Sequence, residues 1–213
     1  NGKKIFYKFT FGENRVQFCS DCDLMGISPQ PNDEELSLIY SDNYFPLSSS
    51  NKEIKHVRLL KTLTAELYLK KLFKYLNISY SRKITGNCKL LEIGTGMGDF
   101  LEAARKKGFD VTGLEFSESS VKQAMDYPKL QGKVICGTIN NLKHKDHFDV
   151  IVINDVLEHI RNPNDFLHKI YSLLKKGGVL FCTVPSLDSF SAKLQGFNWV
   201  EFKTEHLFYY NDR

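Results

Sequence analysis

The sequence lacks any long uninterrupted hydrophobic run. None of its 213 residues lies in a stretch close to the ~20 apolar residues that a membrane-spanning helix needs. The first residues, NGKKIFYKF, do not form a signal peptide either. We therefore expect no membrane partner and no export. A chain that begins at Asn1 rather than at a methionine is typical of a fragment.

Cysteine is scarce, and its number is odd. The chain has five cysteines, and Cys88, Cys136 and Cys182 lie in or beside apolar runs that predict buried strands. A thiol in such a place behaves as a small hydrophobic group. We therefore expect a cytoplasmic protein without a disulfide framework.

A marked excess of one charge is absent as well. Lys and Arg number 29 against 25 Asp and Glu, and the resulting formal charge of +4 is spread along the chain, so nucleic acid is not an expected partner. The sequence also has no internal repeat and no low-complexity segment. A hydrophobic content of 42% in this length favours one well-cored domain with a small appendage.

Turn-forming residues divide the chain near residue 51. The segments SPQPND (residues 28–33) and SSSN (residues 48–51) mark breaks. We therefore expect a small N-terminal β-rich segment over residues 1–51 and a main domain over residues 52–213. Leucines recur at helical spacing between Lys52 and Asn77 and predict one long amphipathic helix at the start of that domain.

The main domain then alternates apolar runs of strand length with polar segments that are compatible with helices. This rhythm predicts an α/β fold of the Rossmann-like doubly wound kind, with a parallel sheet and helices on both faces. Several runs are apolar throughout, which is typical of central strands. The expected strands cover residues 89–93, 110–115, 133–137, 148–153 and 178–184, and the expected helices cover residues 98–107, 117–127 and 163–175.

A glycine-rich turn follows the first of these strands. In LLEIGTGMGDFL (residues 90–101), Gly94, Gly96 and Gly98 lie between an expected strand and an expected helix. Glycines permit a tight turn and let a ligand approach the backbone, and the start of the helix offers unpaired N–H groups. A dinucleotide fingerprint needs a third glycine at the position of Asp99, so the spacing differs from that of NAD-binding domains.

A carboxylate ends the second strand of the domain. Glu115, in VTGLEFS, lies 17 residues beyond Gly98. A carboxylate at this place accepts hydrogen bonds from both ribose hydroxyls of a nucleoside. It predicts a nucleoside-bearing ligand without separating a methyl donor from NAD, and the alternative is a solvated glutamate at a strand end.

These residues resemble one enzyme family. The order Glu-x-Gly-x-Gly-x-Gly from Glu92 to Gly98, with FDVIVINDVLEHIRNP (residues 148–163) and LLKKGGVLFCTVPS (residues 173–186), is similar to the class I S-adenosylmethionine-dependent methyltransferases, especially the ubiquinone type. The resemblance covers residues 89–186. It implies a sheet of strand order 3-2-1-4-5 whose last, antiparallel strands are missing from this chain.

The resemblance implies S-adenosylmethionine as the cofactor. Glu92 and the glycine turn would lie against its methionine end, and the loop from Gly137 against its adenine. The aspartate usual in that loop is absent, so either the backbone or Asn140 would contact the adenine amino group. The implied cofactor-binding residues are Glu92, Gly94, Thr95, Gly96, Gly98, Glu115, Phe116, Thr138, Ile139, Asn154 and Asp155.

Two histidines are the expected catalytic residues. A hydroxyl acceptor must lose a proton, and His159 and His206 are the bases that work near neutral pH. Asp155, Glu158 and His159 also form D-x-x-E-H, and similar clusters bind a divalent cation in some O-methyltransferases of the group that the chain resembles. The alternative, which we expect, is that these side chains orient the cleft without a metal.

The resemblance also bears on the methyl acceptor. LEHI (residues 157–160) and EHL (residues 205–207) favour a hydroxyl group of a small molecule or a sugar as the acceptor. The stretch WVEFKTEHLFYY (residues 199–210) is similar to the segment that closes over the substrate in this family. Alternatively, its aromatic side chains pack against the sheet edge.

The N-terminal segment contains one C-x-x-C pair, Cys19 and Cys22. With the P-x-P that follows and a later aromatic stretch, it is similar to the second half of a zinc ribbon that precedes some bacterial sugar methyltransferase domains. One pair supplies only two of the four ligands of a structural zinc site, so a metal-free β-hairpin is the alternative. The aromatic stretch consists of Tyr40, Tyr44 and Phe45.

Two other functions stay open. An NAD-dependent oxidoreductase or epimerase would share the strand, the turn and Glu115, but it would need the missing third glycine and a catalytic Tyr-x-x-x-Lys pair. A non-catalytic cofactor-binding scaffold would show degraded glycines, and here they are intact. An unfinished sheet edge favours association, so weak homodimerisation is a further expectation.

Overall fold

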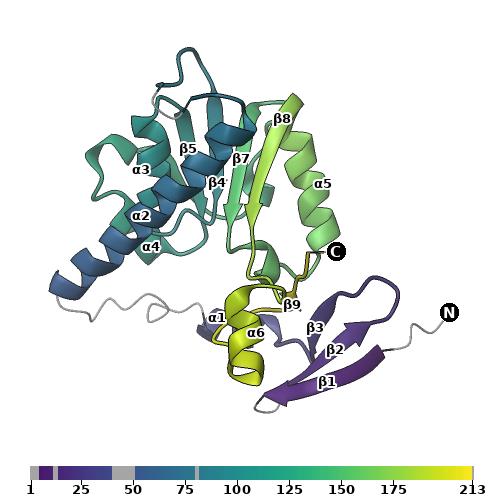
Figure 1. Ribbon diagram of the computed structural model, residues 1–213. Helices are drawn as coiled ribbons and strands as arrows, with labels where there is room; N and C mark the ends of the chain where they lie inside the picture. Colours follow the sequence, from purple (N-terminus) through teal and green to yellow (C-terminus); the bar gives the residue numbers. More distant parts are fainter. Residues whose placement is uncertain (1–4, 12–13, 40–50, 80–81, 213) are drawn as a thin grey trace. The chain divides into compact units, whose positions relative to one another are not determined.

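The computed structural model describes the backbone of residues 5–11, 14–39, 51–79 and 82–212 (Figure 1). Its internal contacts divide the chain into two compact units. Unit 1 contains Asn1–Tyr40, Asp155–Pro163 and Thr183–Arg213, and unit 2 contains Ser41–Asn154 and Asn164–Cys182. The expected domain division at residue 51 stays a prediction.

Unit 2 is built on a parallel sheet. Strand β4 (Lys89–Ile93) pairs with β5 (Asp110–Glu115) and with β7 (Phe148–Asn154), and β5 pairs with β6 (Val134–Cys136). With β8 (Leu174–Thr183) beside β7, the strand order is β6-β5-β4-β7-β8. This order is the predicted 3-2-1-4-5, so the prediction of a Rossmann-like doubly wound fold is confirmed. Weak homodimerisation through an edge of the sheet stays a prediction.

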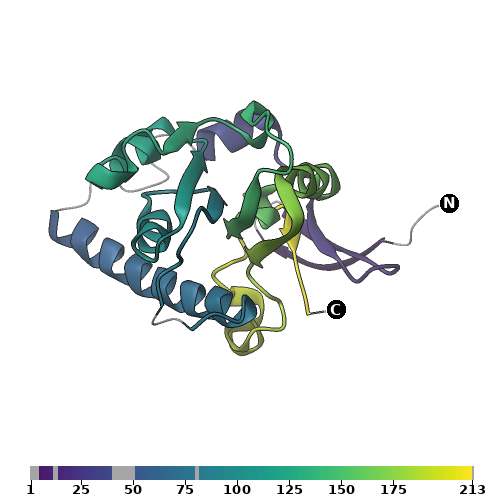
Figure 2. The ribbon, with the colours of Figure 1, turned by 90° about the horizontal axis from the view of Figure 1, so that it is seen from above.

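Helices cover both faces of this sheet. Helix α3 (Asp99–Lys106) follows β4, α4 (Glu118–Ala124) follows β5, and α5 (Pro163–Leu173) precedes β8. Helix α2 (Asn51–Tyr75), the predicted amphipathic helix, packs on α3. Figures 1 and 2 show α2 and α5 on opposite faces of the sheet. The core between these layers includes Leu69, Leu72, Phe73, Leu90, Leu101, Val111, Val150 and Val152.

Two helices end earlier than the sequence predicts. Helix α4 ends at Ala124 rather than near Tyr127, because Pro128 begins a separate single-turn helix, η1 (Pro128–Leu130), and disfavours helical backbone before it. Helix α5 ends at Leu173, and β8 begins already at Leu174. At the start of β8, the Lys175 ammonium group donates hydrogen bonds to both carboxylate oxygens of Asp149 on the neighbouring strand β7, at 2.8 and 2.7 Å.

Unit 1 contains a small antiparallel sheet in the order β1-β2-β3-β9. Strands β1 (Ile5–Phe11), β2 (Asn14–Cys19) and β3 (Met25–Ser28) form a meander, and β9 (Phe208–Tyr209) pairs with β3. The aromatic stretch near the end of the chain thus completes the N-terminal sheet. The hydrophobic core of this unit includes Val16, Ile27, Ala192, Trp199, Leu207 and Tyr209.

Short helices complete unit 1. They are α1 (Asp33–Ile39), α6 (Phe190–Gln195) and the single turns η3 (Leu157–His159) and η4 (Gly196–Asn198). The expected C-x-x-C pair lies at the turn between β2 and β3, with Cys19 ending β2 and Cys22 exposed. The zinc-ribbon interpretation stays a prediction, and its Tyr40, Tyr44 and Phe45 lie outside the described residues.

None of the helices within the described residues is long and apolar enough to cross a membrane.

Candidate functional site

The turn after β4 is shaped by glycines in the left-handed region. Gly96 has a φ of +54° and Gly98 a φ of +82°, a backbone conformation that other residues rarely adopt. A Cβ on Gly98 would lie 3.0 Å from Leu130 Cδ1, so this glycine lets the start of α3 pack closely against Leu130. A Cβ on Gly96 would meet nothing within 4 Å, so the backbone there is open to a ligand.

Glu115 ties this turn to the end of β5. Its Oε2 accepts a hydrogen bond of 2.7 Å from the Gly96 N–H, and its Oε1 accepts one of 2.9 Å from the Ser117 N–H. The Gly94 N–H donates to the Leu114 carbonyl at 2.8 Å. The predicted ribose-binding carboxylate and the predicted methionine-end turn therefore lie together. Thr95 of the same turn is buried.

Two further carboxylates are buried next to the turn. Glu92 in β4 is 3% exposed, and Asp99, the first residue of α3, is 6% exposed. Asp99 Oδ1 accepts a hydrogen bond of 2.8 Å from the Tyr127 hydroxyl, whereas Asp99 Oδ2 and Glu92 Oε2 have no hydrogen-bond partner among the residues that the structure describes. Burial, with Glu115 and Asp99 nearby, raises the pKa of Glu92 well above its ordinary value.

Asn141 fixes the loop after β6. Its Oδ1 accepts hydrogen bonds from the Thr138 N–H at 2.7 Å and from the Thr138 hydroxyl at 3.3 Å. The Gly137 N–H donates to the Glu115 carbonyl at 2.8 Å, which attaches the loop to β5. Sequence reasoning named Asn140 here and missed Asn141. The available signal was the Thr-x-x-Asn spacing of a capping box at the start of η2 (Ile139–Asn141).

Phe116 and Ile139 follow neighbouring strands. The register pairs Glu115 with Cys136, and the Cys136 thiol lies 3.7 Å from the Phe116 carbonyl oxygen. Phe116 is 64% exposed, while Ile139 is buried. An exposed aromatic side chain beside a strand-end carboxylate is suited to contact a nucleobase.

Asn154 and Asp155 lie where β7 ends. Because Ile153 is paired with Ile93, Asn154 follows at the same edge of the sheet as the glycine turn. Asp155 is exposed with a φ of +53°, and its N–H donates to the Thr183 carbonyl at 3.0 Å. Asn154 belongs to unit 2 and Asp155 to unit 1.

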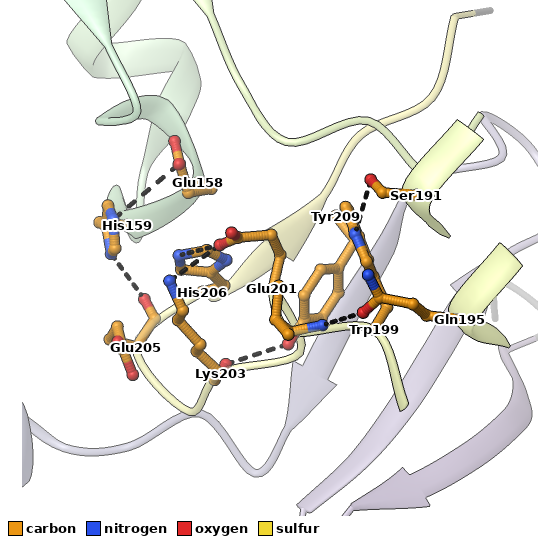
Figure 3. A network of polar contacts seen from close by, with 11 residues as sticks. Glu158, His159, Ser191, Gln195, Trp199, Glu201, Lys203, Glu205, His206 and Tyr209 are labelled. Atoms are coloured by element: carbon orange, nitrogen blue, oxygen red, sulfur yellow. Dashed lines mark hydrogen bonds and ion pairs between the residues drawn. The ribbon is translucent and has the colours of Figure 1, made fainter. Parts of the chain in front are cut away.

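Unit 1 contains a polar cluster of Glu158, His159 and His206 (Figure 3). Glu158 and His159 lie on η3, and His206 precedes β9. The two imidazole rings meet edge to face with their centroids 4.8 Å apart, and Glu158 Oε1 lies 3.9 Å from His159 Nε2. The Leu207 N–H donates to the Glu158 carbonyl at 2.8 Å and joins the two segments. The structure therefore brings together the two histidines that were predicted to be catalytic.

Burial controls the protonation of this cluster. Glu158 is 1% exposed and His206 is 3% exposed, and within the described part of the chain neither Glu158 carboxylate oxygen nor His206 Nδ1 has a hydrogen-bond partner. Burial raises the pKa of Glu158 to about 8. Burial, with His159 adjacent, lowers the pKa of His206 to about 3, and burial also lowers the pKa of His159. At neutral pH the cluster therefore contains neutral imidazoles and a mostly protonated carboxyl group.

His159 is the more accessible of the two histidines. Its side chain is 17% exposed, against 4% for that of His206. His159 Nδ1 lies 3.0 Å from the Glu205 carbonyl oxygen, and donation of the Nδ1 proton to this oxygen leaves a lone pair on Nε2. His206 Nε2 lies 4.0 Å from Glu201 Oε2.

The same three side chains could hold a metal ion. Their ligand atoms all lie within 4.8 Å of one another. One carboxylate and two imidazoles suit a divalent transition metal such as Zn²⁺. Asp155, the first residue of the D-x-x-E-H pattern, is not part of this group, because the helical turn begins only at Leu157. His206 therefore takes the third position in the cluster.

Comparison with known proteins gives consistent matches. The chain matches the family described as a methyltransferase domain over residues 52–213. It is 33% identical over 119 residues to the ubiquinone biosynthesis O-methyltransferase of Maricaulis maris. This match covers 53% of this chain and 47% of that protein. The protein of the same name from Caulobacter vibrioides is 36% identical over 97 residues, covering 43% of this chain and 38% of that protein. The matches thus span about half the length, or less, of these relatives.

A solved structure shares the fold. An S-adenosylmethionine-dependent methyltransferase from Thermotoga maritima matches with a TM-score of 0.52 at 22% sequence identity. The match covers 75% of this chain and 70% of that one. It agrees with the fold that the strand order of unit 2 indicates.

Proposed function

Because the chain belongs to the class I S-adenosylmethionine-dependent methyltransferase family, we propose that it transfers the methyl group of this cofactor to a hydroxyl group of a small molecule or a sugar. The observation that supports the proposal best is the turn between β4 and α3. Its backbone is open at Gly96, and the carboxylates of Glu92, Asp99 and Glu115 lie beside it.

The residues of the turn fit the cofactor chemically. Buried carboxylate oxygens without a partner are costly and are complemented by a ligand that bears positive charge and N–H donors. The free oxygens of Glu92 and Asp99 are of this kind. Each oxygen of Glu115 accepts one backbone hydrogen bond and keeps a second lone pair, which suits a ribose hydroxyl.

The roles of the other residues follow from their places. When bound, the cofactor supplies an electrophilic methyl group, and the chain has to hold the acceptor in line with it and keep water out. We assign the adenosine end to Phe116, Thr138 and Ile139. The remaining assigned residues, at the sulfonium end, are Asn154 and Asp155.

His159 is the base in this proposal. Its Nε2 accepts the proton of the acceptor hydroxyl, while Nδ1–H remains on the Glu205 carbonyl. His206 is too deeply buried to meet an acceptor easily, and its edge-to-face contact holds the His159 ring in place. The names of the two curated relatives, both O-methyltransferases, support a hydroxyl acceptor.

The oxidoreductase alternative is less well supported. Tyr171 and Lys175 have the spacing of a Tyr-x-x-x-Lys pair, but the Tyr171 side chain is 79% exposed on α5. Lys175 is bound by Asp149 near the start of β7, whereas the glycine turn follows the end of the parallel strand β4. This pair is therefore at the wrong edge of the sheet to act on a nicotinamide.

Isothermal titration tests the proposal. S-adenosylmethionine and S-adenosylhomocysteine should bind and NAD should not. Glu115→Ala should weaken both by about tenfold or more, because two charge-assisted contacts to ribose are lost. Glu118→Ala, at an exposed position on α4, is the matched control. Binding of NAD alone would support the oxidoreductase, and binding of none of the three would support the scaffold.

A panel of phenolic and sugar hydroxyl acceptors then tests the acceptor class, with release of S-adenosylhomocysteine as the readout. His159→Ala should lower kcat by about 10² to 10⁴, the usual contribution of a general base. The control is His168→Ala, an exposed histidine on α5. If the wild type turns over and His159→Ala has the same kcat, His159 is not the base.

A divalent cation is a second candidate role for the cluster in unit 1. The observation in its favour is the pair of buried Glu158 oxygens without a partner, next to the unpartnered His206 Nδ1. If activity is unaffected by a chelator and by Glu158→Ala, the cation has no part in the reaction.

A further inference from the structure

The amino edge of the parallel sheet, where the strands of unit 2 begin, is strongly basic. It is opposite the edge with the glycine turn, and β7 and β8 begin there, at the top of Figure 1. The segments at the strand starts are residues 82–89, 102–110, 131–133, 143–149 and 175–176. They contain eleven of the 29 Lys and Arg and four of the 25 Asp and Glu, a formal charge of +7. The remaining 18 Lys and Arg and 21 Asp and Glu give −3, so the fold gathers at one edge a charge that is spread along the sequence.

Short contacts hold these segments side by side. The Ile84 N–H donates to the Lys107 carbonyl at 2.7 Å, which joins the segment before β4 to the segment before β5. The His147 N–H donates to the Leu173 carbonyl at 2.9 Å, which joins the segments before β7 and β8. The Lys89 ammonium lies 3.1 Å from His147 Nε2 and connects β4 with the segment before β7. The segments therefore form one continuous surface on a fixed backbone.

The cations of this edge fall into two groups. Lys133 pairs with Asp110 at 3.1 Å, and Lys175 pairs with Asp149 at 2.7 Å. The second group is exposed, has no ion pair within the described ranges, and belongs to the segments at the starts of the adjacent strands β4, β7 and β8. Neighbouring strands are only about 4.8 Å apart, so these charges lie close together. We call this group the unpaired cations: Arg82, Lys83, Lys143, Lys145 and Lys176.

The surface has charge but lacks the groups by which other polyanions are bound. No exposed Phe, Tyr, Trp or large aliphatic side chain occurs in its five segments, all of which the structure describes. Proteins bind single-stranded nucleic acid by stacking bases on such rings, and amphipathic helices bury such groups in a bilayer. A long duplex or a membrane surface would also meet the negative charge of the other residues. A short acidic segment meets only this edge, so it fits the surface better, although one exposed acid, Asp146, lies among the cations.

We propose that the unpaired cations form a docking surface for an acidic segment, rich in Asp and Glu, of another protein. Carboxylates of such a segment complement the charge without a pocket, and lysine ammonium groups on flexible stems adapt to them. Because the glycine turn lies at the opposite edge of the sheet, a partner docked here does not cover that turn. The surface therefore places the protein beside a partner, and it does not depend on which cofactor binds.

Fluorescence anisotropy with labelled peptides tests the surface. An oligoglutamate peptide is the probe, and a neutral peptide of the same length with alternating Glu and Lys is its control. Only the oligoglutamate should bind, and less tightly as NaCl rises from about 50 mM to about 200 mM. The triple variant Lys143→Gln/Lys145→Gln/Lys176→Gln should weaken it by about tenfold at the lower salt concentration, because three of the five unpaired cations are removed.

A second triple variant is the matched control. Lys74→Gln/Lys122→Gln/Lys129→Gln removes the same charge from exposed positions on α2, α4 and η1, and should change the affinity less than about twofold. Both triple variants should melt at the wild-type temperature, because every replaced side chain is exposed or partly exposed to solvent. Equal weakening by the two triples would show that the peptide responds to total charge alone. That result would overturn the inference, and so would a wild type that does not bind the oligoglutamate.

Competition identifies the class of partner. Duplex DNA and vesicles containing phosphatidylserine should displace the peptide only at a higher concentration of negative charge than unlabelled oligoglutamate does. If either displaces it at a lower concentration, the edge binds nucleic acid or membrane and the inference is wrong. S-adenosylhomocysteine should leave the peptide bound, and displacement by it would place the peptide at the glycine turn and overturn the docking surface. The proposed function is tested separately by the cofactor titration.

Discussion

Glu115 and Asp99 of unit 2 are held in a different way from Glu158 of unit 1. In unit 2, Glu115 accepts hydrogen bonds from two backbone N–H groups, and Asp99 accepts one from a tyrosine. In unit 1, Glu158 is more deeply buried, but neither of its oxygens has a donor among the described residues. Glu115 and Asp99 are therefore oriented acceptors beside an open backbone, whereas burial favours the protonated form of Glu158, as it does for Glu92 at the start of the glycine turn.

The difference separates binding from chemistry. Oriented carboxylates with spare lone pairs can hold a ligand in one pose without changing their own protonation. A carboxyl group with a pKa of about 8, next to two neutral imidazoles, is poised to exchange a proton or to accept a cation. The comparison predicts that substitutions in unit 2 mainly change affinity and that substitutions in unit 1 change pH dependence.

The largest expected effect is on stability at high pH. The pKa of Glu158 rises from 4.5 to about 8 on folding. Because the folded-state value is the higher one, this group's contribution to stability is complete below pH 4.5 and is lost as the pH rises through about 8. Glu158→Gln should therefore gain about 4 kcal/mol over the wild type between pH 5 and pH 9. Urea unfolding at pH 5, 7 and 9 measures this.

The matched control for Glu158→Gln is Glu118→Gln, at an exposed position on α4. It should show the same pH dependence as the wild type. Parallel stability curves for Glu158→Gln and the wild type would contradict the burial argument.

His206 should act in the opposite direction. Its pKa falls from 6.5 to about 3 on folding, so its contribution is complete above pH 6.5 and is lost as the pH falls through about 3. Replacement by Gln should flatten the acid side of the stability curve by about 3 to 4 kcal/mol between pH 7 and pH 3, whereas any loss of packing would lower stability equally at every pH. Thermal melts between pH 3 and pH 7 check this, with His168→Gln as the exposed control. An unchanged acid limb would show that His206 is solvated.

The glycine turn should show a smaller effect that differs between its positions. Gly98→Ala combines a positive φ with a Cβ 3.0 Å from Leu130 Cδ1 and 3.1 Å from Ala124 Cβ, so about 2 to 3 kcal/mol of stability should be lost. Gly96→Ala meets nothing within 4 Å and should lose only about 1 kcal/mol. The new methyl group of Gly96→Ala projects into the open space, however. For each kcal/mol of stability lost, Gly96→Ala should therefore lose more cofactor affinity than Gly98→Ala does. Equal ratios of affinity loss to stability loss for the two variants would contradict the placement of the cofactor at Gly96.

Unit 2 could be predicted from the sequence because its signals are local. Each strand, glycine and cap is specified by neighbouring residues, as in the Ser117 hydroxyl that accepts from the Ser120 N–H at the start of α4. The right-handed βαβ rule then restricts the strand order. The missed contact, between Tyr127 and Asp99, joins residues 28 positions apart and belongs to no motif.

Unit 1 was less accessible to sequence reasoning because its contacts are remote in the chain. Strand β9 pairs Tyr209 with Met25, and two residues of alternating pattern are too few to predict a strand. The polar cluster depends on residue pairs such as His159 and Glu205, which are 46 positions apart. The residue type of the two histidines predicted a base, which stays a prediction, but their burial and the exclusion of Asp155 from the cluster could not be predicted.

The smallest expected effect concerns the contact that ties the start of unit 1 to residues 155–163. Arg161 donates to the Pro31 carbonyl at 2.8 Å, to Asp33 Oδ1 at 3.0 Å and to Gln30 Oε1 at 3.3 Å. Arg161→Ala should cost about 1 kcal/mol, mostly through the carbonyl hydrogen bond. Asp33→Asn should cost little that can be measured, because the Asp33 side chain is 95% exposed and its ion pair is screened. Chemical unfolding of both variants at low and high salt separates the two contributions, and a larger loss for Asp33→Asn would mean that charge rather than the backbone contact holds these segments together.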